Sequence, residues 1–154
     1  TQNDLFDAKT ESVKSKTEVF GKPKSLTSRP DPGLQLRQLA GILSAHGLDT
    51  TVRVADDGVT DDAMRKEIAA NLAREGDFVI VNYLRSALGQ EGGGHISPLG
   101  AYDEASDSFL VMDVNPNGHT WVWVGAEALF KAMRTKDTSE NRGYVLVREP
   151  GAAK

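Results

Sequence analysis

Residues 88–98 read LGQEGGGHISP, a run of three glycines that leads directly into a histidine. Glycines let the main chain approach a ligand closely, and His95 opens an alternating segment that is typical of a β-strand. A turn over 103–107 separates this strand from a second one that ends near Asp113. Such a hairpin places the start of the first strand beside the end of the second, so Asp113 would reach the His95 ring. A carboxylate in that position fixes the tautomer of the imidazole and orients it as a general base.

Each member of this pair also has a purely structural interpretation. His95 would then be a hydrogen-bonded histidine at a strand edge, and Asp113 would cap the turn before residues 115–116. A metal site built from His46, His95 and His119 is disfavoured because no H-x-x-x-H or comparable spacing is present. A phosphate-binding loop is excluded because the glycines enter a strand rather than a helix.

The elements around the hairpin predict an α+β fold. Apolar residues at helical spacing indicate one amphipathic helix that begins at Asp31 and Pro32 and stops at Gly47. A second helix is expected between Thr60 and Gly76. The remaining predicted elements are a short helix over 126–133 and strands over 51–55, 78–81, 95–102, 109–114, 121–124 and 144–147. Helices come first and most strands later, as is typical of an α+β fold with a largely antiparallel sheet.

Two strands carry specific expectations about burial. Residues 78–81 are continuously apolar and β-prone, which predicts a strand buried on both faces. Trp121 and Trp123 alternate with valines, so both indoles should lie on one face of their strand. We expect at least one of them in the core, with a cleft wall as the functional alternative.

Residues 1–33 are polar, lack periodicity and contain the breakers Pro23, Pro30 and Pro32, which predicts an extended arm. The apolar residues of this arm are too sparse for a self-sufficient element, so it should pack on another surface. Residues 34–150 would then form the folded part of a single domain.

Composition excludes several classes of protein. The chain has 154 residues, 39% of them hydrophobic, which suffices for one domain with a core. Its apolar runs are far shorter than the roughly 20 residues of a membrane-spanning helix, so no membrane partner is expected. With 18 Lys and Arg against 22 Asp and Glu, the net charge of −4 argues against nucleic acid as a partner. Cysteine is absent, so these residues supply no disulfide and no thiol nucleophile.

Four further polar residues lie at predicted strand ends. Asn82 and Arg85 follow the strand at 78–81, and Asp137 and Arg142 precede the last strand. Such residues could converge on the charged ends of a ligand, and an arginine fork suits a carboxylate. Taken singly, each is also explained as ordinary loop polarity.

Several of these stretches together resemble one known family. The stretches 82–85, 89–91, 93–99 and 142–144, which read NYLR, GQE, GGHISPL and RGY, look like the phytochelatin synthase family. The likeness is greatest to bacterial members that cleave glutathione. The GHISP element, with Asp113 eighteen residues after the histidine, is the most specific part.

The resemblance implies a papain-like cysteine peptidase fold, of which these residues would form the antiparallel-sheet half with flanking helices. It also implies a Cys-His-Asp triad that cleaves the Cys-Gly bond of glutathione and passes the γ-glutamylcysteinyl group to water or to a second glutathione. By position, it makes His95 the general base and Asp113 its partner, and assigns Asn82, Gly94, Asp137 and Arg142 to acyl-group binding, with Arg85 in the same pocket region.

The family's nucleophilic cysteine and its oxyanion-hole glutamine would precede Thr1. We therefore expect an N-terminal part of the same protein, on which the arm over 1–33 packs, to supply both, and we expect this segment alone to be inactive. The family often has an arginine and a Tyr-Pro-Pro stretch where residues 116–120 read PNGHT, which favours hydrolysis over transfer.

The expected partner is glutathione. No cofactor is required, and a heavy-metal ion and a homodimer are expectations that rest on the resemblance alone. Two other functions stay open: a papain-like peptidase that acts on a leader peptide, and a binding module that recognises γ-glutamyl ligands without cleaving them.

Overall fold

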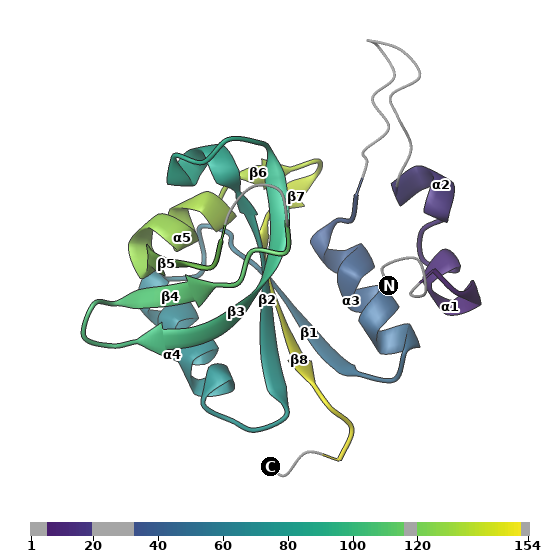
Figure 1. Cartoon of the computed structure of the whole chain (residues 1–154), viewed down its shortest axis with the longest axis horizontal. Coiled ribbons are helices and arrows are strands. Elements are labelled where there is room, and N and C mark those ends of the chain that lie inside the picture. Colours follow the sequence, from purple (N-terminus) through teal and green to yellow (C-terminus); the bar gives the residue numbers. More distant parts are fainter. Residues whose placement is uncertain (1–5, 20–32, 116–119, 152–154) are drawn as a thin grey trace.

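The computed structural model of the chain describes residues 6–19, 33–115 and 120–151 (Figure 1). Its helices are α1 (Ala8–Glu11), α2 (Lys16–Val19), α3 (Leu36–Ala45), α4 (Asp61–Leu72) and α5 (Ala126–Met133), with a short 3-10 helix η2 (Arg85–Leu88). Its strands are β1 (Asp49–Val54), β2 (Asp77–Leu84), β3 (Gly94–Asp103), β4 (Ser108–Val111), β5 (Val122–Gly125), β6 (Lys136–Asp137), β7 (Glu140–Asn141) and β8 (Gly143–Arg148). The α+β fold is confirmed.

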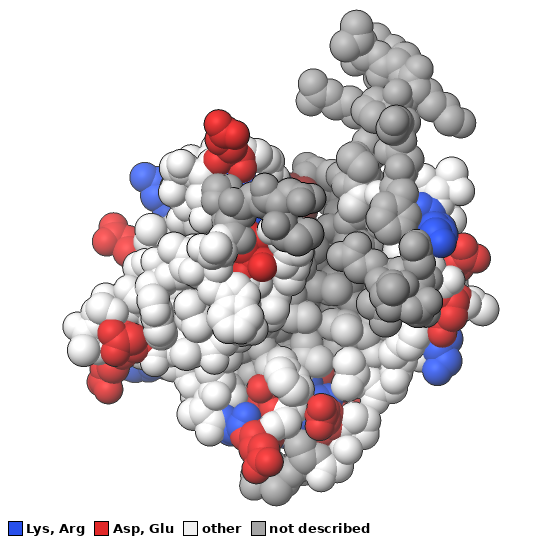
Figure 2. Space-filling view, viewed as in Figure 1, with Lys and Arg blue, Asp and Glu red and all other residues white. Residues whose placement is uncertain are grey.

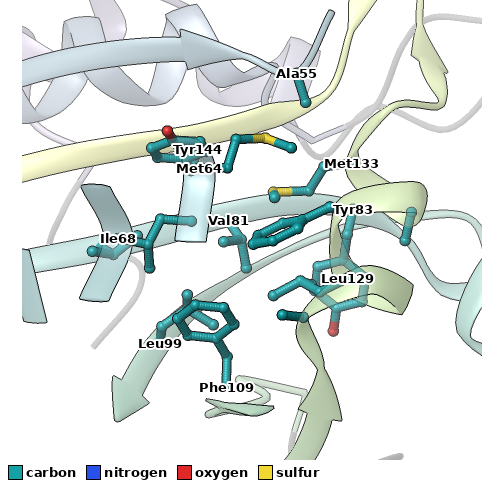
Figure 3. Packing of buried hydrophobic residues seen from close by; sticks show 14 of the residues in the cluster. Ala55, Met64, Ile68, Val81, Tyr83, Leu99, Phe109, Leu129, Met133 and Tyr144 are labelled. Atoms are coloured by element: carbon teal, nitrogen blue, oxygen red, sulfur yellow. The ribbon is translucent and has the colours of Figure 1, made fainter. Parts of the chain in front are cut away.

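Six strands form one antiparallel sheet in the order β1-β8-β2-β3-β4-β5, and β6 and β7 form a separate small hairpin. Helices α4 and α5 pack on one face of the sheet and α3 packs on the other, as Figure 1 shows. The larger core lies under α4 and α5 (Figure 3). Its buried members include Met64, Ile68, Val81, Tyr83, Leu99, Phe109, Leu129, Met133 and Tyr144.

Strand β2 lies inside the sheet and alternates between the two faces. Val79, Val81 and Tyr83 are fully buried under α4 and α5. Ile80 packs on the other side, in the smaller core with α3. Residues 78–81 were expected to be buried on both faces of the sheet. This expectation is wrong at Phe78, which is 49% exposed, because α3 covers only part of the sheet face on which Phe78 lies.

The predicted helix ends are partly confirmed. The Thr60 hydroxyl accepts a hydrogen bond from the Ala63 N–H and caps α4 as expected. Gly47 has a φ of +90°, and the Leu48 N–H donates to the Leu43 carbonyl, which ends α3 where predicted. Asp31 and Pro32 lie outside the described residues, and the N-cap of α3 is Gln35.

Residues 8–11 and 16–19 are short helices, so an extended arm is the wrong description for these parts. Asp7 explains the first helix, because its carboxylate accepts hydrogen bonds from the N–H groups of Lys9 and Thr10. Helix α1 packs against α3 of the same chain.

The expectation of a core tryptophan is also wrong: Trp121 and Trp123 are 61% and 51% exposed. Val122 and Val124 pack against the core and turn both indoles to the outer face of β5.

Among the described residues, the structure has no helix with the length and apolar character of a membrane span. Acidic and basic side chains are interspersed over the face in Figure 2.

An ion pair at one end of the sheet gives a test of stability. Asp77 has a side chain 1% exposed and contacts Arg148 through two hydrogen bonds of 2.7 and 2.9 Å. The hydrogen bonds from Arg148 lower the pKa of Asp77, against the effect of burial. We expect Arg148→Met to lower the free energy of unfolding at pH 7, because the Asp77 carboxylate loses the partner that donates two hydrogen bonds to it.

The pH dependence of this effect follows from the lowered pKa. The contribution of the pair is fully present above the unfolded carboxyl's pKa of about 4, and it is lost as the pH falls through the lower folded value. Urea unfolding of both proteins at several pH values should therefore show a difference that shrinks in acid. A difference that stays constant with pH would contradict this account.

Candidate active site

The hairpin of β3 and β4 brings His95 and Asp113 together as predicted. His95 lies at the start of β3, and Asp113 follows the end of β4. The Nε2 atom of His95 is 3.1 Å from Oδ1 of Asp113, and the side chains are 19% and 1% exposed. The same Oδ1 accepts a hydrogen bond of 2.7 Å from the Asn115 N–H. The imidazole is thus held through one nitrogen by a nearly buried carboxylate.

The carboxylate of Asp113 stays charged despite its burial. Burial by itself would raise its pKa, but the Asn115 N–H, the Arg85 guanidinium and His95 together lower that pKa below its ordinary value. The closest of these contacts is the ion pair between Nη2 of Arg85 and Oδ2 of Asp113, at 2.6 Å. A charged Asp113 would stabilise the imidazolium that forms when His95 takes up a proton.

Arg85 is the first residue of the short helix η2, directly after β2. The sequence allowed it to converge on the charged end of a ligand, and the resemblance placed it in the same pocket region. In the structure its guanidinium pairs with Asp113, which contacts His95, and Arg85 is not among the described residues that line the neighbouring cavity.

A second group of predicted residues forms the polar cluster, defined here as Asn82, Asp137, Arg142 and Gly94. The Asn82 amide donates to Asp137 at 2.9 Å, and Nη1 of Arg142 lies 3.1 Å from the Asn82 oxygen and 3.2 Å from Asp137. Gly94 packs directly against the guanidinium, since a Cβ built there would lie 2.6 Å from Nη1 of Arg142. The polar cluster adjoins the His95–Asp113 pair because Gly94 and His95 are consecutive.

A cavity of about 820 Å³ opens between these residues and helices α1 and α3. One wall holds His95 and the polar cluster. The opposite wall is largely apolar and includes Phe6, Val19, Leu34, Leu39, Ile42 and Leu43. A cavity of this size, with a few convergent polar groups, suits a small polar ligand or an inserted segment of chain.

Two contributors to the site were missed in the sequence. The Tyr83 ring meets the His95 ring edge-on, with centroids 5.8 Å apart and planes at 85°. Thr135 accepts a hydrogen bond of 3.2 Å from Nε of Arg142. The first contact follows from the pairing of Tyr83 with His95 across β2 and β3, and no sequence pattern pointed to the second.

The described ranges contain no group of three or more His, Cys, Asp or Glu side chains that could hold a metal ion. Of the three histidines considered for such a site, His119 lies outside these ranges. His46 contacts Thr10, with Nε2 at 3.1 Å from the hydroxyl oxygen.

The sequence of the chain is similar to those of several known proteins. A sequence model of phytochelatin synthase matches residues 8–144. The glutathione gamma-glutamylcysteinyltransferase of Schizosaccharomyces pombe is 29% identical over 126 residues, which cover 80% of this chain and 30% of that protein. For the glutathione gamma-glutamylcysteinyltransferase 3 of Lotus japonicus the identity is 30% over 117 residues, with coverage of 75% and 24%.

The glutathione gamma-glutamylcysteinyltransferase 1 of Arabidopsis thaliana is 35% identical over 98 residues, which cover 60% of this chain and 20% of that protein. The chain thus spans less than a third of the length of these relatives. The family match extends over most of the described residues, including the hairpin and the polar cluster. The chain belongs to the phytochelatin synthase family.

Proposed function

We propose that this chain forms the histidine-aspartate part of an enzyme that cleaves the Cys-Gly bond of glutathione through a Cys-His-Asp triad. The observation that carries the proposal is the His95–Asp113 pair beside a cavity whose polar wall holds one acid and one guanidinium. The relatives' name, glutathione gamma-glutamylcysteinyltransferase, supports glutathione as the substrate.

The nucleophile in this proposal is a cysteine outside these 154 residues, because they contain none. Its sulfur attacks the cysteinyl carbonyl carbon of glutathione while His95 accepts the thiol proton. The Cys-Gly bond then breaks as His95 returns that proton to the glycine nitrogen, and a γ-glutamylcysteinyl thioester remains. With Nε2 directed at Asp113, the proton transfers would use Nδ1 of the ring. Water attacks the thioester in the last step and releases γ-glutamylcysteine.

The polar cluster would hold the γ-glutamyl end of the substrate. That end carries an ammonium and a carboxylate on the same carbon atom. Asp137 and Arg142 lie 3.2 Å apart and have the matching charges, so the carboxylate of Asp137 would face the ammonium and the guanidinium the carboxylate. Asn82, which contacts both, would keep the two groups in place.

We propose hydrolysis, and not transfer to a second glutathione, as the main reaction. Residues 116–120 support this, because they read PNGHT where the family often has an arginine and a Tyr-Pro-Pro stretch. The apolar wall of the cavity supports a further point, that the segment with the cysteine packs against α3 beside His95. The proposed reaction needs no cofactor.

The proposal is tested by incubating the protein that contains this chain and a nucleophilic cysteine with glutathione in ¹⁸O-labelled water. We expect equal amounts of glycine and γ-glutamylcysteine, with ¹⁸O in the latter and a thioester adduct in the intact mass. Glutathione binding by calorimetry without glycine release would overturn the proposal in favour of a binding module. Cleavage of longer peptides alone would overturn it in favour of a leader peptidase.

The place of Gly94 in the polar cluster gives a specific prediction. Gly94→Ala adds a Cβ within 2.6 Å of Nη1 of Arg142, so the guanidinium must move away from Asn82 and Asp137. We expect the KM for glutathione to rise about tenfold, which corresponds to about 1.4 kcal/mol of binding free energy. Gly93→Ala is the matched control, because its Cβ would meet no atom within 4 Å. An equal effect of both substitutions would show that the loop, and not Arg142, is what the methyl group disturbs.

A further inference from the structure

We infer that Arg85 is a positioning residue, which holds the Asp113 carboxylate in the one orientation that supports His95. This inference rests on the proposed function for its kinetic consequence. In this inference Arg85 binds a carboxylate of the protein, that of Asp113, and not a carboxylate of the ligand. The evidence is the set of distances around Asp113.

The two oxygens of Asp113 have different partners. Oδ1 lies 3.1 Å from His95 and accepts the Asn115 N–H, whereas Oδ2 lies 2.6 Å from Nη2 of Arg85. A carboxylate held only through Oδ1 could turn about its terminal bond, because that torsion is broad. Nη2 of Arg85 is not aligned for a hydrogen bond with Oδ2, so the restraint is the close ion pair itself, which keeps Oδ2 turned toward the guanidinium and Oδ1 toward the imidazole.

Burial makes this ion pair hard to exchange for a ligand. The side chains of Arg85 and Asp113 are 6% and 1% exposed. A buried charge that loses its partner is strongly destabilised, so Arg85 would not leave Asp113 for a substrate carboxylate without a large cost. The cavity already has another guanidinium that could bind a substrate carboxylate, that of Arg142 in the polar cluster.

The glycine-rich loop before His95 holds Arg85 in place. The Arg85 N–H donates to the Gly93 carbonyl at 3.0 Å, and the Gln90 N–H donates to the Arg85 carbonyl at 3.1 Å. Nη1 of Arg85 donates to Oε1 of Gln90 at 3.3 Å. Gly92 has a φ of +113° and packs so closely that a Cβ would lie 3.1 Å from Cδ of Arg85. The loop thus contacts the Arg85 side chain at Gly92 and Gln90 and joins Arg85 to the strand that bears His95.

The test compares Arg85→Met, Arg85→Lys and the wild type in the protein that contains the nucleophilic cysteine. We expect Arg85→Met to lower kcat for glycine release about 10- to 100-fold with KM within about threefold, because only the geometry of the base is disturbed. Arg85→Lys should recover part of kcat. A rise in KM at nearly constant kcat would overturn the inference, because it would mean that Arg85 binds the substrate.

A second readout does not depend on turnover, so it separates failure of this inference from failure of the proposed function. ¹⁵N NMR of the imidazole in the same protein should show the neutral His95 ring protonated at Nε2 in the wild type and a mixture of tautomers in Arg85→Met. An unchanged tautomer in Arg85→Met would overturn the inference even if the enzyme cleaves glutathione.

Two variants keep the test decisive. Arg148→Met removes another arginine that pairs with a buried aspartate, Asp77, at the far end of β2, and should change neither kcat nor the His95 tautomer. If Arg85→Met does not fold, Gln90→Ala removes one support of the guanidinium and should shift kcat and the tautomer in the same direction by a smaller amount. A wild-type tautomer and kcat in Gln90→Ala would then count against the inference.

Discussion

Replacing His95 by Gln should lower the rate of glycine release from glutathione about 1000-fold or more. Glutamine can still donate a hydrogen bond to the Asp113 carboxylate, but it cannot take the thiol proton or return it to the leaving amine. General acid-base catalysis by one residue contributes about 10²- to 10⁴-fold, and a cysteine that loses its base is also less ionised. Initial rates of glycine release, measured at saturating glutathione, give the size of the effect.

Two comparisons isolate the cause of that loss. His46→Gln is the comparison, because the His46 ring lines the same cavity but makes its hydrogen bond with Thr10, and it should lose far less activity than His95→Gln. The double variant His95→Gln with Asp113→Asn should be little worse than His95→Gln alone, since residues that act as a unit are not additive. A His95→Gln enzyme with more than a tenth of wild-type activity would exclude His95 as the general base.

Gly143→Ala should lower the free energy of unfolding by about 3 kcal/mol. Gly143 pairs with Val54 on one side and with Asn82 on the other. A Cβ at this position would lie 2.0 Å from the Arg53 carbonyl oxygen and 3.0 Å from the Ala55 nitrogen. Both atoms belong to the main chain, so no side-chain rotation relieves the overlap and β1 must separate from β8.

Urea unfolding at neutral pH measures this loss as a shift of the midpoint at unchanged slope. Gly125→Ala serves as the control, because its Cβ would meet no atom within 4 Å, and it should change stability by less than about 1 kcal/mol. If Gly143→Ala unfolds at the wild-type midpoint, the close approach of β1 and β8 at this position is not a feature of the native protein.

The parts of the fold that sequence reasoning predicted are those that depend on local patterns. The Thr60 cap, the end of α3 at Gly47 and the β3–β4 hairpin each follow from residues close together in the chain. The His95–Asp113 contact could be predicted for the same reason, because one hairpin joins both residues. Helix α1 escaped prediction because its single turn is held by the Asp7 cap and by packing on α3, and not by periodicity.

The parts that were missed depend on contacts between distant elements. Arg85 stands next to β2 in the sequence, and only the pairing of β2, β3 and β4 brings it to Asp113. The outward position of Trp121 and Trp123 depends on which face of β5 meets the core. Aromatic composition carries no information about that choice. Predicting the arginine's partner from the sequence would have required the register of three strands.

The alternation of β2 links folding to function more tightly than the site alone suggests. Val79, Val81 and Tyr83 complete the main core, while Asn82, between two of them, reaches the polar cluster on the other face. A slip of β2 by one residue would exchange the side chains on its two faces. The Asn82 amide would then point into the hydrophobic core, and an aliphatic side chain would point into the polar cluster. A misregistered molecule would thus lose its core and the polar cluster together. If the polar cluster binds glutathione as proposed, glutathione binding would report on the correct register of β2 during refolding.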